Sequence, residues 1–216
     1  MATVAGLRER KKEQTRRHLS DVATGLFLER GFDVVTVAEI AEAAEVSVNT
    51  VYNYFPAKEN LFLDREDEQV ERPSRRVRER APGESAAEAV LRAVRRDVEE
   101  RRPWVGLTEG YERFMRVLFG SPTLMAFLQR MQYRTCDRLA ETLREETGAA
   151  PGDPMPDLVA GLMLWLTNSV YRIAGADALA GVPVDETAAR MLAMLDDAES
   201  LLGAPAWDYA RRPAAS

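Results

Sequence analysis

Apolar residues recur at intervals of three and four along almost the whole chain of 216 residues. Between Leu19 and Phe27, for example, the apolar side chains share one face of a helix. No segment sustains the alternation that is typical of a β-strand. Isoleucine occurs only at Ile40 and Ile173, whereas alanine, leucine, arginine and glutamate, all good helix formers, dominate. The pattern therefore predicts an all-α fold.

Residues that begin or end helices divide this pattern into about nine predicted helices. Gly31 follows the first of them, at a position where a left-handed glycine commonly caps a helix. We expect a small N-terminal unit over residues 1–56 and a larger helical bundle over 57–216. The expected helices cover 7–30, 36–44, 47–55, a charged segment from 57 that is interrupted at Pro73, 84–102, 104–119, 122–146, 155–176 and 185–202.

The composition excludes several kinds of chemistry. A single cysteine, Cys136, cannot form an intrachain disulfide, and a single histidine, His18, leaves no usual Cys/His zinc site and no Ser-His-Asp or Cys-His arrangement. We therefore expect no catalytic residue, no metal, no cofactor and no enzymatic activity. The longest uncharged apolar stretch, residues 158–171, is shorter than the roughly 20 residues that span a membrane. With no visible leader sequence, a cytoplasmic protein without a membrane partner is the expectation.

Charge is unevenly distributed along the chain. The net charge is −6, but residues 1–20 hold six basic and two acidic residues, a local charge of +4, so the remainder sums to −10. An acidic body with a basic arm is compatible with nucleic-acid binding. The arm, from Arg8 to Arg17, has two interpretations: it contributes to DNA binding, for instance in a minor groove, or it is a solvated tail.

The segment from residue 36 to 58 has the pattern of two short helices joined by a tight turn. Thr36 and Glu39 form a capping box at the first helix, and Ser47 can N-cap the second. Pro56 cannot continue the second helix because it lacks an N–H. This is a helix-turn-helix pattern. A plain helical corner in a bundle, without DNA binding, is the alternative interpretation.

The outward face of the second helix carries small, amide, hydroxyl and phenol side chains. It has no acidic residue, which suits the major groove because carboxylates would repel phosphates. The residues of this face are Val48, Asn49, Thr50, Tyr52 and Asn53.

Residues 10–62 combine the motifs Leu26-Phe27, Gly31-Phe32, Thr36–Ala41, Val46-Ser47, Thr50–Glu59 and Leu61-Phe62. In this combination they resemble the TetR family of bacterial transcriptional regulators. The resemblance implies that Val48, Asn49 and Asn53 read bases, as asparagine can pair with adenine and valine can touch a thymine methyl. It also implies a set of phosphate contacts through hydroxyls, helix N-terminal amides and a lysine. These are Thr36, Ser47, Thr50, Tyr52, Tyr54 and Lys58.

Glu45 departs from the family pattern, which usually has glycine at this position of the turn. If the backbone there is left-handed, glutamate costs about 1 kcal/mol relative to glycine. It also places a negative charge near the DNA groove.

The C-terminal part resembles the family only in its all-helical architecture. The helix expected at 155–176 is apolar on nearly every side and therefore needs cover on all sides. We expect it and the last helix to pack against a second copy and form a homodimer; a single large core within one chain is the alternative. The predicted interface residues are Leu158, Leu162, Leu166, Met191, Leu192, Leu195 and Leu202.

A ligand pocket is expected inside the bundle. Aromatic and methionine side chains with a few polar groups suit a small apolar ligand, and ordinary core packing is the alternative. The candidate lining residues are Trp104, Leu107, Tyr111, Phe114, Met115, Phe127, Met131, Thr135, Trp165 and Asn168. The charged stretch from 65 to 80 is interpreted as a solvated helix with i,i+4 ion pairs.

Together, the resemblance implies a dimeric one-component transcriptional regulator. We predict a repressor that a small-molecule effector releases from double-stranded DNA carrying an inverted-repeat operator. Two alternatives stay open. One is an all-helical carrier or enzyme whose helix-turn-helix is only structural, and the other is an activator or a repressor that needs no ligand.

Overall fold

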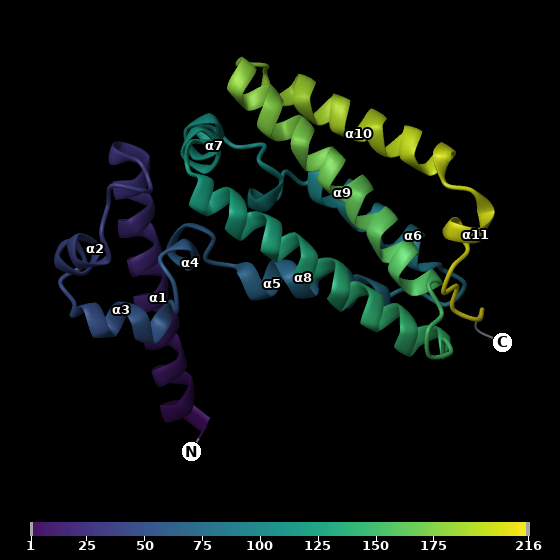
Figure 1. The fold of residues 1–216 in the computed structure, drawn as a ribbon, viewed down its shortest axis with the longest axis horizontal. Helices are drawn as coiled ribbons and strands as arrows, with labels where there is room; N and C mark the ends of the chain where they lie inside the picture. Colours follow the sequence, from purple (N-terminus) through teal and green to yellow (C-terminus); the bar gives the residue numbers. More distant parts are fainter. Residues whose placement is uncertain (1, 215–216) are drawn as a thin grey trace. The chain divides into compact units, whose positions relative to one another are not determined.

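The computed structural model describes the backbone of residues 2–214 and the side chains of residues 10–214. Every regular element in that range is a helix (Figure 1), which confirms the predicted all-α class. A 3-10 helix, η1, covers Pro103–Val105. The α-helices are α1 (Ala2–Arg30), α2 (Val37–Ala43), α3 (Val48–Tyr54), α4 (Glu59–Phe62), α5 (Glu66–Arg78), α6 (Ala86–Glu99), α7 (Tyr111–Gly120), α8 (Pro122–Thr147), α9 (Met155–Ala180), α10 (Val184–Leu201) and α11 (Ala204–Trp207).

Two differences from the expected helices have local causes. The predicted interruption at Pro73 is wrong, because α5 continues through this residue. Proline in a helix costs about 3 kcal/mol, and burial of Val70 and Val77 on α5 offsets that cost. The segment 104–119 is not one helix, since Gly106 and Gly110 adopt φ of 79° and 80° and separate η1 from α7.

The chain forms two compact units. Unit 1 contains residues up to Glu66 together with Arg116–Phe127, and unit 2 contains Asp67–Met115 together with the residues from Leu128 onwards. The end of α7 and the start of α8 thus belong to the N-terminal unit, which chain order alone does not indicate. The division of the sequence into 1–56 and 57–216 stays a prediction.

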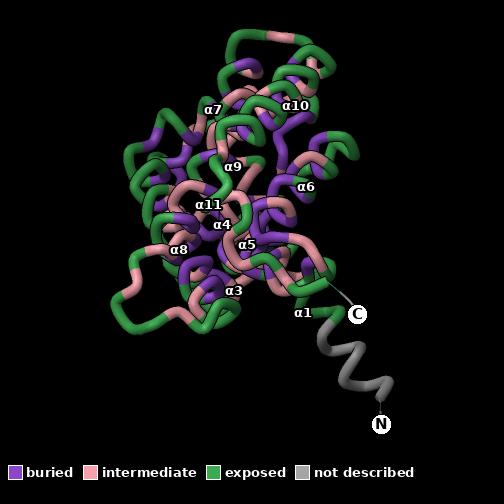
Figure 2. The backbone as a smooth tube through the Cα atoms, turned by 90° about the vertical axis from the view of Figure 1, so that its right-hand side faces the viewer, coloured by how far each residue is buried: buried purple, intermediate pink, exposed green. Residues whose placement is uncertain are grey.

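The core of unit 1 is aromatic. The ring centroids of Phe27 and Phe32 lie 4.9 Å apart, and those of Phe27 and Phe62 lie 5.9 Å apart in an edge-on arrangement. Ile40 of α2 and Val51 of α3 are also almost fully buried. Figure 2 colours the backbone by burial, and buried positions alternate with exposed ones along the helices. Each such side chain contributes about 1.5–3 kcal/mol by burial, so this core holds α2 and α3 against α1.

Unit 2 is a bundle in which α6, α9 and α10 share one hydrophobic core. Leu91 of α6, Leu143 of α8, Met163 of α9 and Leu195 of α10 are all at most 2% exposed. α9 and α10 run side by side (Figure 1) and are joined at Gly181, whose φ of 72° is left-handed. None of the described helices is long and apolar enough to cross a membrane.

The predicted interface residues divide into two groups. Leu166, Met191 and Leu195 are buried in the chain's own core, so in this structure they offer no surface to a second copy. The reason is that α10 directs its apolar stripe inward against α9. Leu158 is 63% exposed, and the remaining predicted positions are half-buried. These are Leu162, Leu192 and Leu202.

The interpretation of residues 65–80 as a solvated helix is wrong for three arginines. Arg72 and Arg80 are only 6% and 4% exposed, and the side chain of Arg76 is 13% exposed. Arg72 pairs with Glu68 in the expected i,i+4 manner, but Arg76 and Arg80 pair with carboxylates of other helices. Because these partners lie far away in the sequence, the local pattern could not indicate them.

Candidate DNA-binding surface

The start of α2 has the predicted capping box. The Glu39 N–H donates to Thr36 Oγ1 at 3.2 Å, and the Thr36 N–H donates to Glu39 Oε2 at 2.8 Å. Arg30 at the end of α1 donates to Glu39 Oε1 at 2.7 Å. These bonds, from the Thr36 backbone first and then from Arg30, lower the pKa of Glu39 to about 2. Glu39 therefore stays charged and ties α2 to α1.

The turn between α2 and α3 is left-handed at Glu45, with a φ of 55°. The Val46 N–H donates to Ala41 O at 2.9 Å and the Glu45 N–H donates to Glu42 O at 3.0 Å. This pair of bonds is a Schellman motif, in which glycine normally occupies the position of Glu45. Glu45 therefore has the left-handed backbone conformation that its place in the turn made us consider from the sequence.

We predict that Glu45→Gly stabilises the protein by about 0.5–1 kcal/mol. Relief of the left-handed strain of about 1–2 kcal/mol exceeds the extra unfolded-state entropy of glycine. Glu42→Gly is the matched control, since Glu42 is exposed within α2 and glycine in a helix costs about 0.5–1 kcal/mol. Urea denaturation should give opposite signs for the two variants, and equal signs would contradict the strain at Glu45.

The first turn of α3 is fixed by Ser47, which confirms this residue as N-cap. The Thr50 N–H donates to Ser47 Oγ at 3.1 Å, and the two hydroxyl oxygens lie 2.8 Å apart. Val51 on the inner face is 1% exposed and anchors the helix in the core of unit 1.

The outer face of α3 is accessible along its whole length. Val48 is 38% exposed and Tyr52 51% exposed, and Asn49 and Asn53 are exposed as well. Thr50 and Tyr54 are half-buried at the edges of this face. The helix itself carries no charged side chain, so it presents amide, hydroxyl and methyl groups, the functional groups that read base edges.

Arg16 holds α1 against the end of α3, a role that the sequence analysis missed. Its guanidinium donates to Tyr54 O at 2.8 Å and to Asp64 O at 2.5 Å. It also lies 4.4 Å from the centroid of the buried Phe55 ring. Arg16 therefore fixes the C-terminal end of α3 from the side opposite its exposed face. The only available sequence signal was its place on the apolar side of the helix, one residue before the exposed Arg17.

Lys58 is turned inward in this structure. Its ammonium donates to Phe32 O at 2.5 Å and lies 4.3 Å from the Phe32 ring centroid. Burial lowers the pKa of Lys58 from its ordinary value, against the opposing effect of Asp33. The lysine thus closes the loop between α1 and α2, and to reach a phosphate it would have to leave the Phe32 carbonyl.

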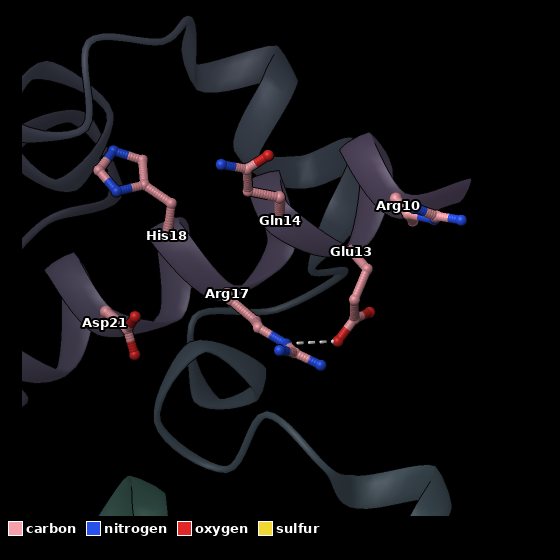
Figure 3. A pocket seen from close by; sticks show the side chains of 6 residues that line it. All are labelled: Arg10, Glu13, Gln14, Arg17, His18 and Asp21. Atoms are coloured by element: carbon pink, nitrogen blue, oxygen red, sulfur yellow. Dashed lines mark hydrogen bonds and ion pairs between the residues drawn. The ribbon is translucent and has the colours of Figure 1, made fainter. Parts of the chain in front are cut away.

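The basic arm is part of α1. Arg10, Lys11 and Lys12 are exposed, while the side chain of Arg8 lies outside the described residues. Arg17 forms an exposed ion pair with Glu13 at 2.9 Å. An open hollow beside this part of α1 is lined by α1 side chains alone (Figure 3), so it is a surface feature of one helix and not an enclosed cavity. Its lining residues are Arg10, Glu13, Gln14, Arg17, His18 and Asp21.

The predicted pocket residues do not form one uniform group. Leu107, Met115, Phe127 and Thr135 are buried, but Trp165 is 57% exposed and lies outside the core. The others are half-buried, and most of them lie in unit 2. They are Trp104, Tyr111, Phe114, Met131 and Asn168.

A helix-turn-helix with an exposed, uncharged second helix, followed by a helical bundle, defines the class of helix-turn-helix DNA-binding regulators. Residues 19–64 match the family model described as bacterial regulatory proteins, tetR family. The regulator TcmR of Streptomyces glaucescens is 32% identical over 148 residues, which are 66% of this chain and 65% of TcmR.

Solved structures share the fold. NalD of Pseudomonas aeruginosa, a secondary repressor of the MexAB-OprM multidrug efflux pump, matches with a TM-score of 0.55 and 19% identity over 86% of this chain and 97% of NalD. A complex of SmeT with triclosan matches with a TM-score of 0.55 and 16% identity over 86% and 91% of the two chains. Residues 19–64 therefore form a TetR-family DNA-binding domain, and the chain is a transcriptional regulator.

Proposed function

We propose that this protein is a dimeric repressor that binds an inverted-repeat operator through α3 and leaves it when a small molecule binds in unit 2. The observation that carries the proposal is the exposed, carboxylate-free face of α3, held rigidly by the Ser47 cap and by Arg16. A rigid polar helix of this kind fits the major groove. Such a regulator acts in the cytoplasm, and nothing in this function requires an enzymatic step.

The exposed residues of α3 divide into two proposed roles. Val48, Asn49 and Asn53 contact base edges, since their side chains point away from the core. Tyr52 contacts a phosphate through its hydroxyl. The side chains of the other proposed phosphate contacts are less accessible or already hydrogen bonded. These residues would contact phosphates mainly through their backbone amides, or after a small rearrangement of the side chain. These are Thr36, Ser47, Thr50, Tyr54 and Lys58.

A second copy would cover the exposed face of α9. Leu158, Leu162 and Trp165 share one face of that helix at helical spacing, and Leu158 and Trp165 are more than half exposed. The exposure of Trp165 fits an interface better than a pocket. A dimer presents two copies of α3 to successive major grooves, roughly 34–36 Å apart.

The small-molecule part of the proposal is supported by the interior of unit 2. Aromatic and methionine side chains gather there around Tyr111 and Met115, and such groups suit planar ligands. The triclosan complex shows that a related fold accommodates a small molecule.

Substitution of α3 residues tests the DNA-binding proposal. We expect Tyr52→Ala to weaken binding to all DNA sequences about tenfold or more, because it removes a phosphate contact. Asn49→Ala should instead relax the preference at one base-pair position by about 1–3 kcal/mol. Both are read from binding to a library of random DNA. Tyr133→Ala is the control, since Tyr133 is 64% exposed on α8 and outside the helix-turn-helix.

An unchanged sequence preference in Asn49→Ala would contradict the base-reading role of Asn49. If neither the wild type nor any variant selects a sequence, the helix-turn-helix is structural, and the carrier becomes the better interpretation.

A further inference from the structure

Two arginines of α5 reach into the interior of unit 2. Arg72 is 6% exposed, and its guanidinium lies 4.2 Å from the centroid of the Trp104 ring. Arg76, one helical turn later, forms an ion pair with Asp97 of α6. Trp104 also donates its Nε1–H to Asp97 Oδ2 at 3.0 Å. The result is a buried polar cluster inside unit 2.

The buried charges of this cluster do not balance. Asp97, whose side chain is 8% exposed, compensates Arg76. The carboxylate partner of Arg72 is Glu68, 3.2 Å away, whose side chain is 42% exposed and therefore largely hydrated. Because a buried charge costs several kcal/mol unless it is well paired, Arg72 is the member of the cluster that gains most from a further anion.

Aromatic groups surround these charges. Tyr171 of α9 lies within the electrostatic reach of both arginines and of Asp97, and burial raises the pKa of its phenol. Burial also raises the pKa of the neighbouring Tyr111, so both hydroxyls stay protonated and can donate hydrogen bonds. Tyr111 stacks on Phe114 with centroids 5.8 Å apart.

Two glycines beside Tyr111 and Met115 leave no room for a side chain. A Cβ on Gly106 would lie 2.3 Å from the Tyr111 ring, and one on Gly175 would lie 2.7 Å from Met115 Cε. The absence of these side chains lets Tyr111 and Met115 lie flat against η1 and α9. Aromatic and apolar side chains therefore pack closely in the same part of unit 2 as the buried arginines.

We propose that the effector of this regulator is a flat apolar molecule bearing one anionic group, a carboxylate or sulfonate, and that Arg72 binds this group. The inference rests on the proposed function and adds an anionic group to the small apolar ligand that the sequence predicted. The planar guanidinium of Arg72 can hold a carboxylate or sulfonate with two parallel hydrogen bonds while Trp104 supports its opposite face. Tyr171, which lies within electrostatic reach of Arg72, and its neighbour Tyr111 would contact the ligand body.

A pair of probes with one scaffold tests the charge requirement. 8-Anilinonaphthalene-1-sulfonate carries an anion, and N-phenyl-1-naphthylamine is its uncharged counterpart. We expect the full-length wild type to bind the sulfonate at least about tenfold more tightly in fluorescence titrations. Arg72→Gln should abolish most of this ratio and leave the affinity for the uncharged probe nearly unchanged.

Two further variants separate binding from folding. Arg75→Gln removes an exposed arginine of the same helix and should preserve the ratio. Arg72→Lys keeps the charge but loses the planar fork, so it should retain part of the preference for the sulfonate. Thermal unfolding of each variant establishes that the titrated protein is folded.

Three results would overturn the anion site. The wild type could bind the two probes with equal affinity, or bind neither up to about 1 mM. Alternatively, Arg72→Gln could lose the same affinity for both probes. Operator binding, measured on the same samples, separates this outcome from failure of the proposed function. If an uncharged ligand released the protein from its operator, the proposed repressor function would stand and the proposed anion site would be wrong. Absence of any DNA binding would discard the repressor, whatever the probes do.

Discussion

Replacing Arg16 by alanine will lower the free energy of unfolding of unit 1 by about 2–4 kcal/mol. The substitution removes two charge-assisted hydrogen bonds, to Tyr54 O and Asp64 O. It also removes the guanidinium from the ring of Phe55. Since these contacts fix the end of α3, the variant should bind DNA more weakly even though Arg16 faces away from the recognition surface.

Arg17→Ala is the matched control for this prediction. Arg17 is the next residue, has the same charge, and forms only the exposed i,i+4 pair with Glu13, which is worth about 0.3–0.5 kcal/mol. Urea denaturation followed by circular dichroism compares the two. Equal losses of stability would show that Arg16 is no more than part of a solvated basic arm.

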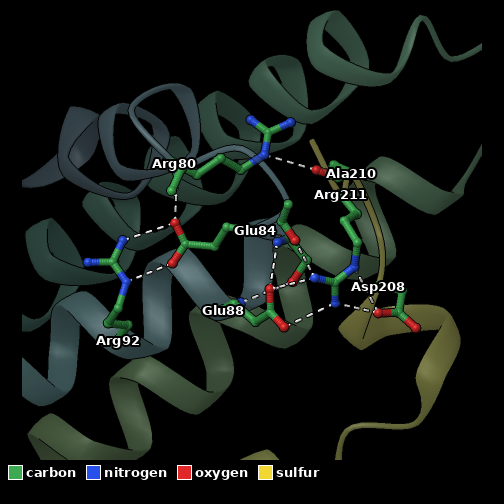
Figure 4. Close-up of polar contacts among 10 residues, drawn as sticks. Arg80, Glu84, Glu88, Arg92, Asp208, Ala210 and Arg211 are labelled. Atoms are coloured by element: carbon green, nitrogen blue, oxygen red, sulfur yellow. Dashed lines mark hydrogen bonds and ion pairs between the residues drawn. The ribbon is translucent and has the colours of Figure 1, made fainter. Parts of the chain in front are cut away.

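Replacing Arg80 by alanine will have the largest effect on unit 2, a loss of about 3–5 kcal/mol. The Arg80 side chain is 3% exposed and forms an ion pair with Glu146 of α8 at 2.6 Å. It also donates to Val77 O at 2.6 Å and to Ala210 O of the C-terminal segment at 2.9 Å (Figure 4). Removal of the arginine takes away the side-chain donor of Ala210 O and leaves Glu146 with the longer ion pair to Arg212, at 3.6 Å.

The C-terminal segment should loosen in the same variant. Arg211 binds Glu88 of α6 at 2.8 Å (Figure 4), and the Gly83 N–H and the Arg212 N–H form backbone bonds of 3.0 Å to Arg212 O and Glu84 O. We expect faster amide exchange in residues 209–212 of Arg80→Ala. Arg75→Ala, an exposed position of α5, should change neither stability nor exchange. Unaltered exchange in Arg80→Ala would contradict this role of Arg80.

The helix-turn-helix could be predicted because its determinants are local. The Thr36 capping box, the Ser47 N-cap and the left-handed Gly31 each depend on residues within three or four positions. The strain at Glu45 could be anticipated for the same reason, since a turn of this length needs one left-handed residue. The confirmed predictions are those in which backbone N–H and C=O groups find their hydrogen-bond partners a few residues away in the sequence.

The arginines show why the rest could not be predicted. Arg72 and Arg80 are buried and Arg16 is half-buried, whereas Arg17 and Arg75 are exposed, but all five occur in similar charged stretches. What distinguishes them is a partner such as Asp64 or Glu146, 48 and 66 residues away. The same limit applies to Lys58, whose contact with Phe32 spans 26 residues.

Helix faces were also ambiguous where apolar residues surround the helix. The sequence of α9 indicates that every side is covered but not by what, and Leu166 faces the core while Leu158 and Trp165 face outward. On α10, Met191 and Leu195 complete the chain's own core. Which apolar face packs within the chain depends on the register of α9 against α10, which no local pattern specifies.

Binding of the wild-type protein to random double-stranded DNA, followed by a salt titration of the selected sequence, tests the central claim most directly. We expect enrichment of an inverted repeat whose half-site centres lie about 10–10.5 base pairs apart, or a multiple of that spacing. The logarithm of the affinity should fall linearly with the logarithm of the salt concentration as phosphate contacts release counterions. Failure to enrich any sequence, or an affinity that does not depend on salt, would contradict a repressor that reads DNA with α3.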